Sequence, residues 1–87
     1  MQRTLTILNE RGLHARAAAK FVKCTELFVA DIVVTKGDNE VSGSSIMGLM
    51  MLNASRGTFI CVDAVGVDAE PALDALTELV GDKFGEK

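Results

Sequence analysis

The sequence predicts an α+β fold in which a four-stranded, largely antiparallel sheet carries three helices on one face. Two observations lead to this class. Strand-like and helix-like segments follow one another in the order strand, helix, strand, strand, helix, strand, helix. The first and last strand-like segments, residues 4–7 and 58–65, are apolar on one face and mixed on the other, which is typical of a sheet covered on one side only. We therefore expect an open-faced two-layer sandwich.

The first strand and the first helix are predicted by different spacings of apolar residues. Leu5 and Ile7 alternate with threonines, which suits a strand with one wet face, and residues 9–12 supply a polar turn. From Ala15 onwards, apolar residues recur at helical intervals with arginine and lysine between them. This spacing predicts an amphipathic helix that ends near Leu27.

A hairpin is predicted in the middle of the chain. Residues 32–35 are all β-branched and predict a second strand. Residues 37–39, Gly-Asp-Asn, are typical of a tight turn, and residues 40–42 of a short returning strand. The carboxylates of Asp38 and Glu40 are therefore expected to be solvated turn residues rather than an acid–base pair.

The last third of the chain predicts a strand followed by a helix. The apolar positions that share one face of residues 58–65 are Ile60, Val62 and Ala64. Asp68 is placed to N-cap the helix that follows. The apolar stripe of that helix consists of Leu73, Leu76, Leu79, Val80 and Phe84. The tail at residues 85–87 is expected to fray.

The apolar run at residues 46–52 follows Ser44 and Ser45, either of which can N-cap a short helix. At about 100° per residue its apolar side chains point nearly all round the helix, and only Gly48 leaves a gap. A small domain cannot bury every side of such a helix, so some methionines should be exposed and form a docking surface; cover by loops or self-association is the alternative. The residues expected in this surface are Ile46, Met47, Leu49, Met50 and Met51.

Length, charge and cysteine content exclude several classes of protein. With 87 residues we expect a single domain, residues 1–87, with one modest core. The net charge of −3 argues against a nucleic-acid partner, and the sequence predicts neither membrane insertion nor a signal peptide. Cys24 and Cys61 lack Cys-x-x-Cys spacing, so buried reduced thiols and a cytoplasmic location are expected. With one histidine and no spaced ligand cluster, no metal site is expected.

The only histidine of the chain, His14, falls where the first strand gives way to the first helix, within Gly12-Leu13-His14-Ala15-Arg16. Free backbone N–H groups and the macrodipole at a helix start both favour anions. A nucleophilic imidazole there, with Arg16 two residues on, is a candidate for holding a phosphoryl group. The alternative is a histidine that acts as a cap, a surface residue or a satisfied core group.

Other chemistries lack their motifs in this sequence. There is no Gly-x-Ser-x-Gly elbow for a hydrolase, and neither a Walker loop nor Gly-x-Gly-x-x-Gly for a nucleotide, so no cofactor is expected. RNA-binding domains share the element order but stack bases on sheet aromatics, whereas most phenylalanines here lie in or beside helices. A phosphohistidine carrier fits best, because it needs only an exposed histidine and a docking face. A non-catalytic small-ligand or RNA-binding module is the alternative.

Two blocks of sequence carry a close resemblance to a known family. Residues 12–18, Gly-Leu-His-Ala-Arg-Ala-Ala, and residues 45–50, Ser-Ile-Met-Gly-Leu-Met, resemble the HPr family of bacterial phosphotransferase-system phosphocarriers. The resemblance implies that His14 accepts a phosphoryl group from enzyme I and donates it to an enzyme IIA-type domain, with Arg16 assisting. It also implies that Ser45 is a regulatory site, modified in some lineages by an HPr kinase/phosphorylase. Such a carrier is a monomeric, transferase-type component rather than a stand-alone enzyme.

One departure from the family pattern is Ala17, which stands where the family often has proline directly after the arginine. Alanine lacks the fixed φ of proline in the first helical turn, so His14 is expected to be held less rigidly. Ala17 and the ending Phe84-Gly85-Glu86 are similar to proteobacterial and nitrogen-branch relatives. The sequence therefore leaves open whether the chain serves sugar transport or nitrogen-branch regulation.

Overall fold

One four-stranded sheet organises the chain in this computed structural model, which describes residues 1–87. The strands are β1 (Gln2–Thr6), β2 (Asp31–Lys36), β3 (Asn39–Ser42) and β4 (Phe59–Val65). Their order across the sheet is β1-β4-β2-β3, and every neighbouring pair is antiparallel. The helices are α1 (Ala15–Thr25), α2 (Ile46–Met51) and α3 (Ala69–Gly81), followed by a 3-10 turn, η1 (Lys83–Gly85). The predicted α+β class and element order are confirmed.

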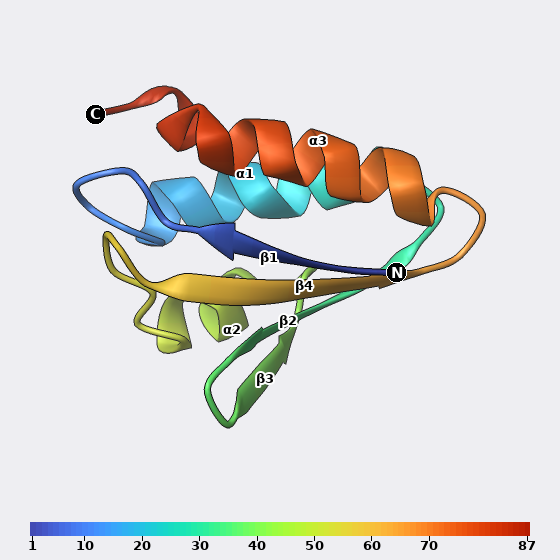
Figure 1. Cartoon of the computed structure of the whole chain (residues 1–87), viewed down its shortest axis with the longest axis horizontal. Coiled ribbons are helices and arrows are strands. Elements are labelled where there is room, and N and C mark those ends of the chain that lie inside the picture. Colours follow the sequence, from blue (N-terminus) through green and yellow to red (C-terminus); the bar gives the residue numbers. More distant parts are fainter.

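The helices cover one face of the sheet and leave the other open. Helices α1 and α3 run side by side along the strands, and α1 also contacts α2 (Figure 1). The predicted inward positions of β4 are buried, whereas Phe59, which points to the opposite face, is 64% exposed. The largest fully buried side chains include Phe21, Phe84, Ile7 and Leu49. The alternation seen in the sequence therefore corresponds to a single covered face.

The helix starts agree only in part with the predicted caps. Ser45, rather than Ser44, caps α2, because its hydroxyl oxygen accepts from the Gly48 N–H at 2.9 Å. Asp68 does stand at the N-cap position of α3, but its carboxylate does not cap the helix. That carboxylate accepts instead from the backbone N–H of Val29 at 2.7 Å. The reason is its backbone (φ −104°, ψ 22°), which lies outside the extended region from which a side chain reaches back to the helix.

The expectation that residues 85–87 fray is wrong. Phe84, just before them, is only 1% exposed and anchors the end of the chain in the core. The backbone N–H of Glu10 donates to the carbonyl of Lys87 at 2.7 Å. The C-terminal tail therefore lies against the loop between β1 and α1.

The two cysteines are free and each is half-buried, so the expectation of fully buried thiols is wrong in degree. Burial raises the pKa of the Cys24 thiol, which disfavours its reactive thiolate form. No helix has the length and apolar character that crossing a membrane requires.

Candidate functional site

His14 occupies the N-cap position of α1, at the end of a tightly fixed loop. Gly12 adopts a left-handed φ of +65°, and a Cβ atom at this position would lie 2.5 Å from the carbonyl oxygen of Ala54. Leu13 buries its side chain and donates its backbone N–H to the same oxygen at 2.9 Å. Only glycine permits this approach, so the backbone at Gly12 sets the position of His14 beside the segment that follows α2.

Asn9 closes the same loop from the inside. Its side chain is fully buried, and its Nδ2 donates to the carbonyl of Gly12 at 2.8 Å and to Oε1 of Glu86 at 2.9 Å. Both partners are acceptors, which fixes the orientation of the amide and leaves its Oδ1 buried without a hydrogen-bond partner. Asn9 therefore joins the loop of His14 to the C-terminal tail.

The imidazole of His14 is held by the carboxylate of Glu86. The Nε2 atom of His14 lies 2.9 Å from Oε1 and 3.0 Å from Oε2 of Glu86. The two side chains are 15% and 21% exposed, so the expectation of an exposed histidine is wrong in degree. The C-terminal tail, for which the sequence predicts fraying, covers part of the ring. Because an ionised carboxylate can only accept, Nε2 carries the hydrogen of this contact.

The other ring nitrogen of His14, Nδ1, is left available. It makes no hydrogen bond as an N-cap, and it is not a buried unpaired atom. In a neutral ring with its hydrogen on Nε2, the nucleophilic lone pair lies on Nδ1. The first helical hydrogen bond runs from the Ala18 N–H to the His14 carbonyl, so the N–H groups of residues 15–17 have no helical acceptors. The ring therefore stands at a helix start, where an anion is favoured.

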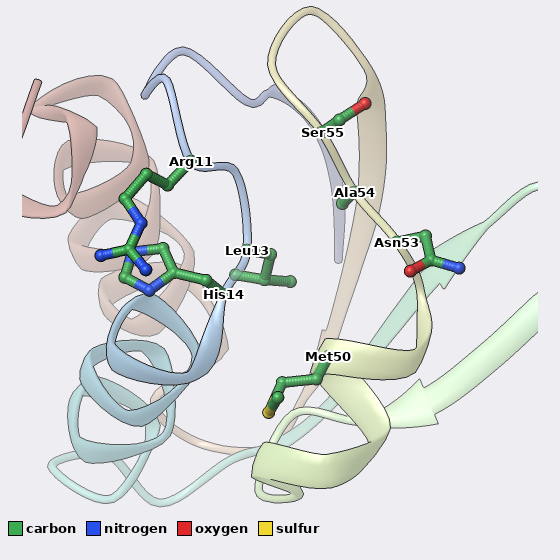
Figure 2. Close-up of a pocket in the computed structure, with 7 residues that line it drawn as sticks. All are labelled: Arg11, Leu13, His14, Met50, Asn53, Ala54 and Ser55. Atoms are coloured by element: carbon green, nitrogen blue, oxygen red, sulfur yellow. The ribbon is translucent and has the colours of Figure 1, made fainter.

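Arg11 and Arg16 bring positive charge to this region from two sides. Arg16 is exposed and lines a hollow together with Arg11 and Glu86. Arg11 also lines the neighbouring hollow, which is lined by His14 as well. Figure 2 shows the side chains of Arg11 and His14 on the same side of this hollow. No group of three or more His, Cys, Asp or Glu side chains is placed to hold a metal ion. The structure thus puts the two predicted residues, His14 and Arg16, in adjoining hollows that Arg11 connects.

The contacts around Glu86 lower its pKa from the ordinary value. The hydrogen bond from Asn9 is the largest cause; the hydrogen bond and charge of His14 and the charge of Arg11 act in the same direction, while burial opposes them. A lowered pKa means that the stabilising contribution of this carboxylate is fully present above its ordinary pKa. That contribution is lost as the pH falls through the lowered value. At neutral pH Glu86 is therefore ionised and tied to His14.

Exposed apolar side chains of α2 lie next to this site. Met50 lines the same hollow as His14 (Figure 2). Met47, on the same helix, is 71% exposed. Leu49, expected in the docking surface, is completely buried, so its assignment to that surface is wrong. It belongs to the core, because it lies on the side of α2 that packs inwards. We use the term α2 face for the four exposed residues, Ile46, Met47, Met50 and Met51.

We expect alanine substitution to lower stability strongly at Leu49 and hardly at all at Met47. Leu49→Ala should lower the free energy of unfolding by about 2–5 kcal/mol, because it removes a fully buried side chain and leaves a cavity. Met47→Ala should change it by less than about 0.5 kcal/mol. Urea denaturation of both variants measures the difference. A large loss of stability in Met47→Ala would mean that Met47 packs in the core and is not available for docking.

Three residues of the site, Asn9, Arg11 and Glu86, were missed by sequence reasoning. The polar turn at residues 9–12 indicated a loop but did not show that Asn9 points inwards. Glu86 stands in a tail whose composition predicts fraying, and its contact with His14 spans 72 positions of the chain. Arg11 flanks the motif of His14 and was the one of the three with a signal, since it adds a cation near a candidate phosphoryl site.

The chain is similar to one protein family over nearly its whole length. The family described as "PTS HPr component phosphorylation site" matches residues 1–82. Phosphocarrier protein HPr of Neisseria meningitidis serogroup B is 45% identical over 86 residues, which cover 99% of this chain and 97% of that protein. Phosphocarrier protein NPr of Shewanella violacea is 42% identical over 86 residues, covering 99% and 94%. The crystal structure of HPr-C-His from Thermoanaerobacter tengcongensis superposes with a TM-score of 0.94 at 42% identity, covering 100% of this chain and 98% of that chain.

Proposed function

Because this chain belongs to the HPr family, the phosphocarrier proteins of the phosphotransferase system, we propose that His14 is the residue that carries the phosphoryl group. The observation that carries the proposal is the contact of His14 Nε2 with Glu86, since it leaves Nδ1 as the accessible nucleophile. A purely structural histidine would be expected to have both ring nitrogens engaged or buried. Here one nitrogen is held and the other is available.

The transfer reaction follows from this arrangement. The lone pair on Nδ1 of His14 attacks the phosphorus atom of the donor's phosphoryl group. The bond from phosphorus to the donor breaks, and its electron pair returns to the donor. The product carries a phosphorus–nitrogen bond at Nδ1 and keeps its hydrogen on Nε2. Transfer to the acceptor reverses these steps, so the chain returns unchanged after each cycle.

Arg16 and the start of α1 support the proposal as the groups that stabilise the transferred charge. The unpaired N–H groups of residues 15–17 and the macrodipole favour an anion at this end of α1. The guanidinium of Arg16 is exposed and free of ion pairs with other residues, so it can turn towards a phosphoryl group on His14. A carrier must release the phosphoryl group again. Moderate stabilisation of the phosphoryl group by Arg16 and the helix start therefore suits this role.

Membership of the HPr family implies enzyme I and enzyme IIA-type domains of the phosphotransferase system as partners. The proposal assigns docking of both to the α2 face, because these apolar side chains are exposed next to His14. We also propose that residues 1–87 form one domain, since the buried apolar side chains form one core.

We propose that the chain is a monomer, because the α2 face is then free to bind partners. We propose a cytoplasmic location, which suits the two free cysteines. Relatives named HPr and NPr are similar to this chain to nearly the same degree. The chain could therefore serve either sugar uptake or nitrogen-branch regulation.

The experiment that tests the proposed function is phosphorylation of the purified chain. The chain is incubated with enzyme I and labelled phosphoenolpyruvate, and the label is then tested in acid and in alkali. A phosphohistidine is expected to lose its label in acid and keep it in alkali. Absence of label with an active, cognate enzyme I would contradict the carrier role and favour a non-catalytic binding module.

We propose a regulatory site at Ser45, the N-cap residue of α2, which stands beside the α2 face. Ser45→Asp should keep the cap, since aspartate is a good N-cap residue, but should weaken binding of enzyme I at least about tenfold by placing a charge beside apolar contacts. Isothermal titration with enzyme I measures this. Ser44→Asp is the matched control, because Ser44 is an exposed neighbour whose side chain bonds Ser42 rather than α2. Unchanged affinity in Ser45→Asp would remove α2 from the proposed interface, and with it the reason for an HPr kinase/phosphorylase to act there.

A further inference from the structure

Glu86 lies outside both sequence blocks that carry the family resemblance, yet it makes the only hydrogen bonds to the His14 ring. The carboxylate meets Nε2 at 2.9 and 3.0 Å with both of its oxygens. Each side chain is mostly covered, so water screens this contact less than it screens a fully exposed ion pair. The contact is therefore strong enough to influence the chemistry of the ring.

The charge of the ring changes when Nδ1 takes a phosphoryl group. A neutral imidazole that keeps its hydrogen on Nε2 and gains a bond from Nδ1 to phosphorus becomes a cation, and part of this charge lies at Nε2. A carboxylate at Nε2 stabilises that cation, as the aspartate of a Ser-His-Asp triad stabilises its imidazolium. The charged ring is also the better leaving group when the phosphoryl group moves on, because the electron pair of the breaking bond returns to a cationic ring.

We propose that Glu86 is a positioning residue for phosphoryl transfer, whose carboxylate keeps the proton on Nε2 of His14 and balances the positive charge of the ring while Nδ1 carries the phosphoryl group. This inference rests on the proposed function of His14. On acceptance, Glu86 fixes the tautomer that leaves the lone pair on Nδ1. On donation, it keeps the ring protonated, so the neutral ring with hydrogen on Nε2 is restored as the phosphorus–nitrogen bond breaks.

Asn9 holds Glu86 in this position. Its buried amide donates to Oε1 of Glu86 and to the carbonyl of Gly12, so one side chain fixes both the carboxylate and the loop that carries His14. The buried, unpaired Oδ1 of Asn9 is the cost of this orientation, because the opposite orientation would set that oxygen against two acceptors. The tail is anchored further by Phe84, whose side chain is buried.

Glu86 is the only negatively charged side chain that contacts the ring of His14. The other charged groups of this region are either cations or make no contact with the ring. The cations that face this region are Arg11 from the loop, Arg16 and Lys20 from α1 and Lys87 from the tail. Lys20 donates to the carbonyl of Phe84 at 2.6 Å and does not pair with Glu86. Glu10 lines the hollow shared with Glu86 but makes no ion pair with His14. Since nearby cations oppose a positive ring, its balance depends on Glu86.

The test follows the ring by nitrogen-15 NMR in the unphosphorylated and the enzyme I-phosphorylated full chain across pH. In the phosphorylated wild type, the ring should lose its Nε2 proton at a pH about one unit higher than in Glu86→Ala. Glu86→Gln, which can still accept from Nε2 but has no charge, should keep the tautomer of the neutral ring and lose most of that shift. The phosphorylated wild type and phosphorylated Glu86→Ala should therefore lose the Nε2 proton at two different pH midpoints. At a pH between these midpoints, phosphoryl transfer to the acceptor domain should be up to about tenfold slower in Glu86→Ala than in the wild type. Glu10→Ala is the matched control, since it removes a carboxylate of the same hollow.

Each result decides the proposal in one direction. Equal pH midpoints in wild type, Glu86→Ala and Glu10→Ala would overturn it and leave Glu86 as a packing residue of the tail. An equal shift in Glu86→Ala and Glu10→Ala would also overturn it, because the effect would then be that of net charge alone. A wild type that takes no label on His14 would instead overturn the proposed function, so the two failures are distinguishable. Near-ultraviolet and far-ultraviolet circular dichroism of each variant verifies that it is folded.

Discussion

His14→Ala is expected to abolish phosphorylation of the chain by enzyme I completely. His14 is the only histidine, and no other side chain combines a free nucleophilic nitrogen with the start of a helix. The fold should survive, because the ring lies at the surface edge of a loop and its contact is with Glu86 in the tail. We expect a loss of about 2 kcal/mol or less in the free energy of unfolding, the scale of a hydrogen-bonded contact with a charged group. Labelling and urea denaturation of the same samples measure both effects.

Two outcomes of this variant would change the interpretation. Label that persists in His14→Ala would place the phosphoryl group on another residue. A loss of several kcal/mol would show that His14 is structural, and loss of label would then say nothing about chemistry. His14→Gln is the matched variant, because it keeps a polar side chain of similar reach that can still bond Glu86. A non-catalytic binding module would keep its ligand in both variants.

Gly12→Ala is expected to have the second large effect, since it damages both stability and phosphorylation. A Cβ atom on Gly12 would lie 2.5 Å from the carbonyl oxygen of Ala54, a backbone atom that cannot move aside without moving the loop. The left-handed φ of +65° adds strain for any L side chain. We expect a loss of about 2–4 kcal/mol in the free energy of unfolding and a severalfold slower phosphorylation, because the hydrogen bond from Leu13 to Ala54 that positions His14 would be broken.

Gly37→Ala separates the two causes of that effect. Gly37 has nearly the same φ, +61°, but a Cβ atom there would meet no atom within 4 Å. Gly37→Ala should therefore lower the free energy of unfolding only by the conformational strain, about 1–2 kcal/mol, and should leave phosphorylation unchanged. Urea denaturation and the rate of labelling measure both variants. Equal losses of stability in Gly12→Ala and Gly37→Ala would mean that the approach to Ala54 contributes nothing, and that the loop is free to shift without harm.

Buried faces, most of the helix starts and the position of the only histidine could be predicted because each depends on neighbours in the sequence. The alternation of apolar residues predicted which face of β4 is buried, and Ile60, Val62 and Ala64 are indeed completely buried. The serine pair before α2 predicted its cap, although only the structure selects Ser45. The junction of strand and helix predicted that His14 would stand at the N-terminus of α1.

The apolar run of α2 shows where such local reasoning stops. Its side chains point nearly all round the helix, so periodicity does not tell which of them face the core. Leu49 is buried and Met47 is exposed because α2 packs against α1 and the sheet on one side only. The same holds for Asp68, whose carboxylate bonds Val29 across the fold and not its own helix.

The sequence by itself determined the α+β architecture, the position of His14 at a helix start and the family. These follow from spacings of a few residues and from a contiguous motif, in which the interacting groups are close in the chain. The tertiary structure alone decided that Glu86 holds the Nε2 atom of His14, that Asn9 holds Glu86 and that the C-terminal tail is ordered. These contacts join residues more than 70 positions apart, and they form because the burial of Phe84 brings the tail back to the loop. No periodicity or composition encodes such a meeting of distant segments, since it depends on how the whole core packs.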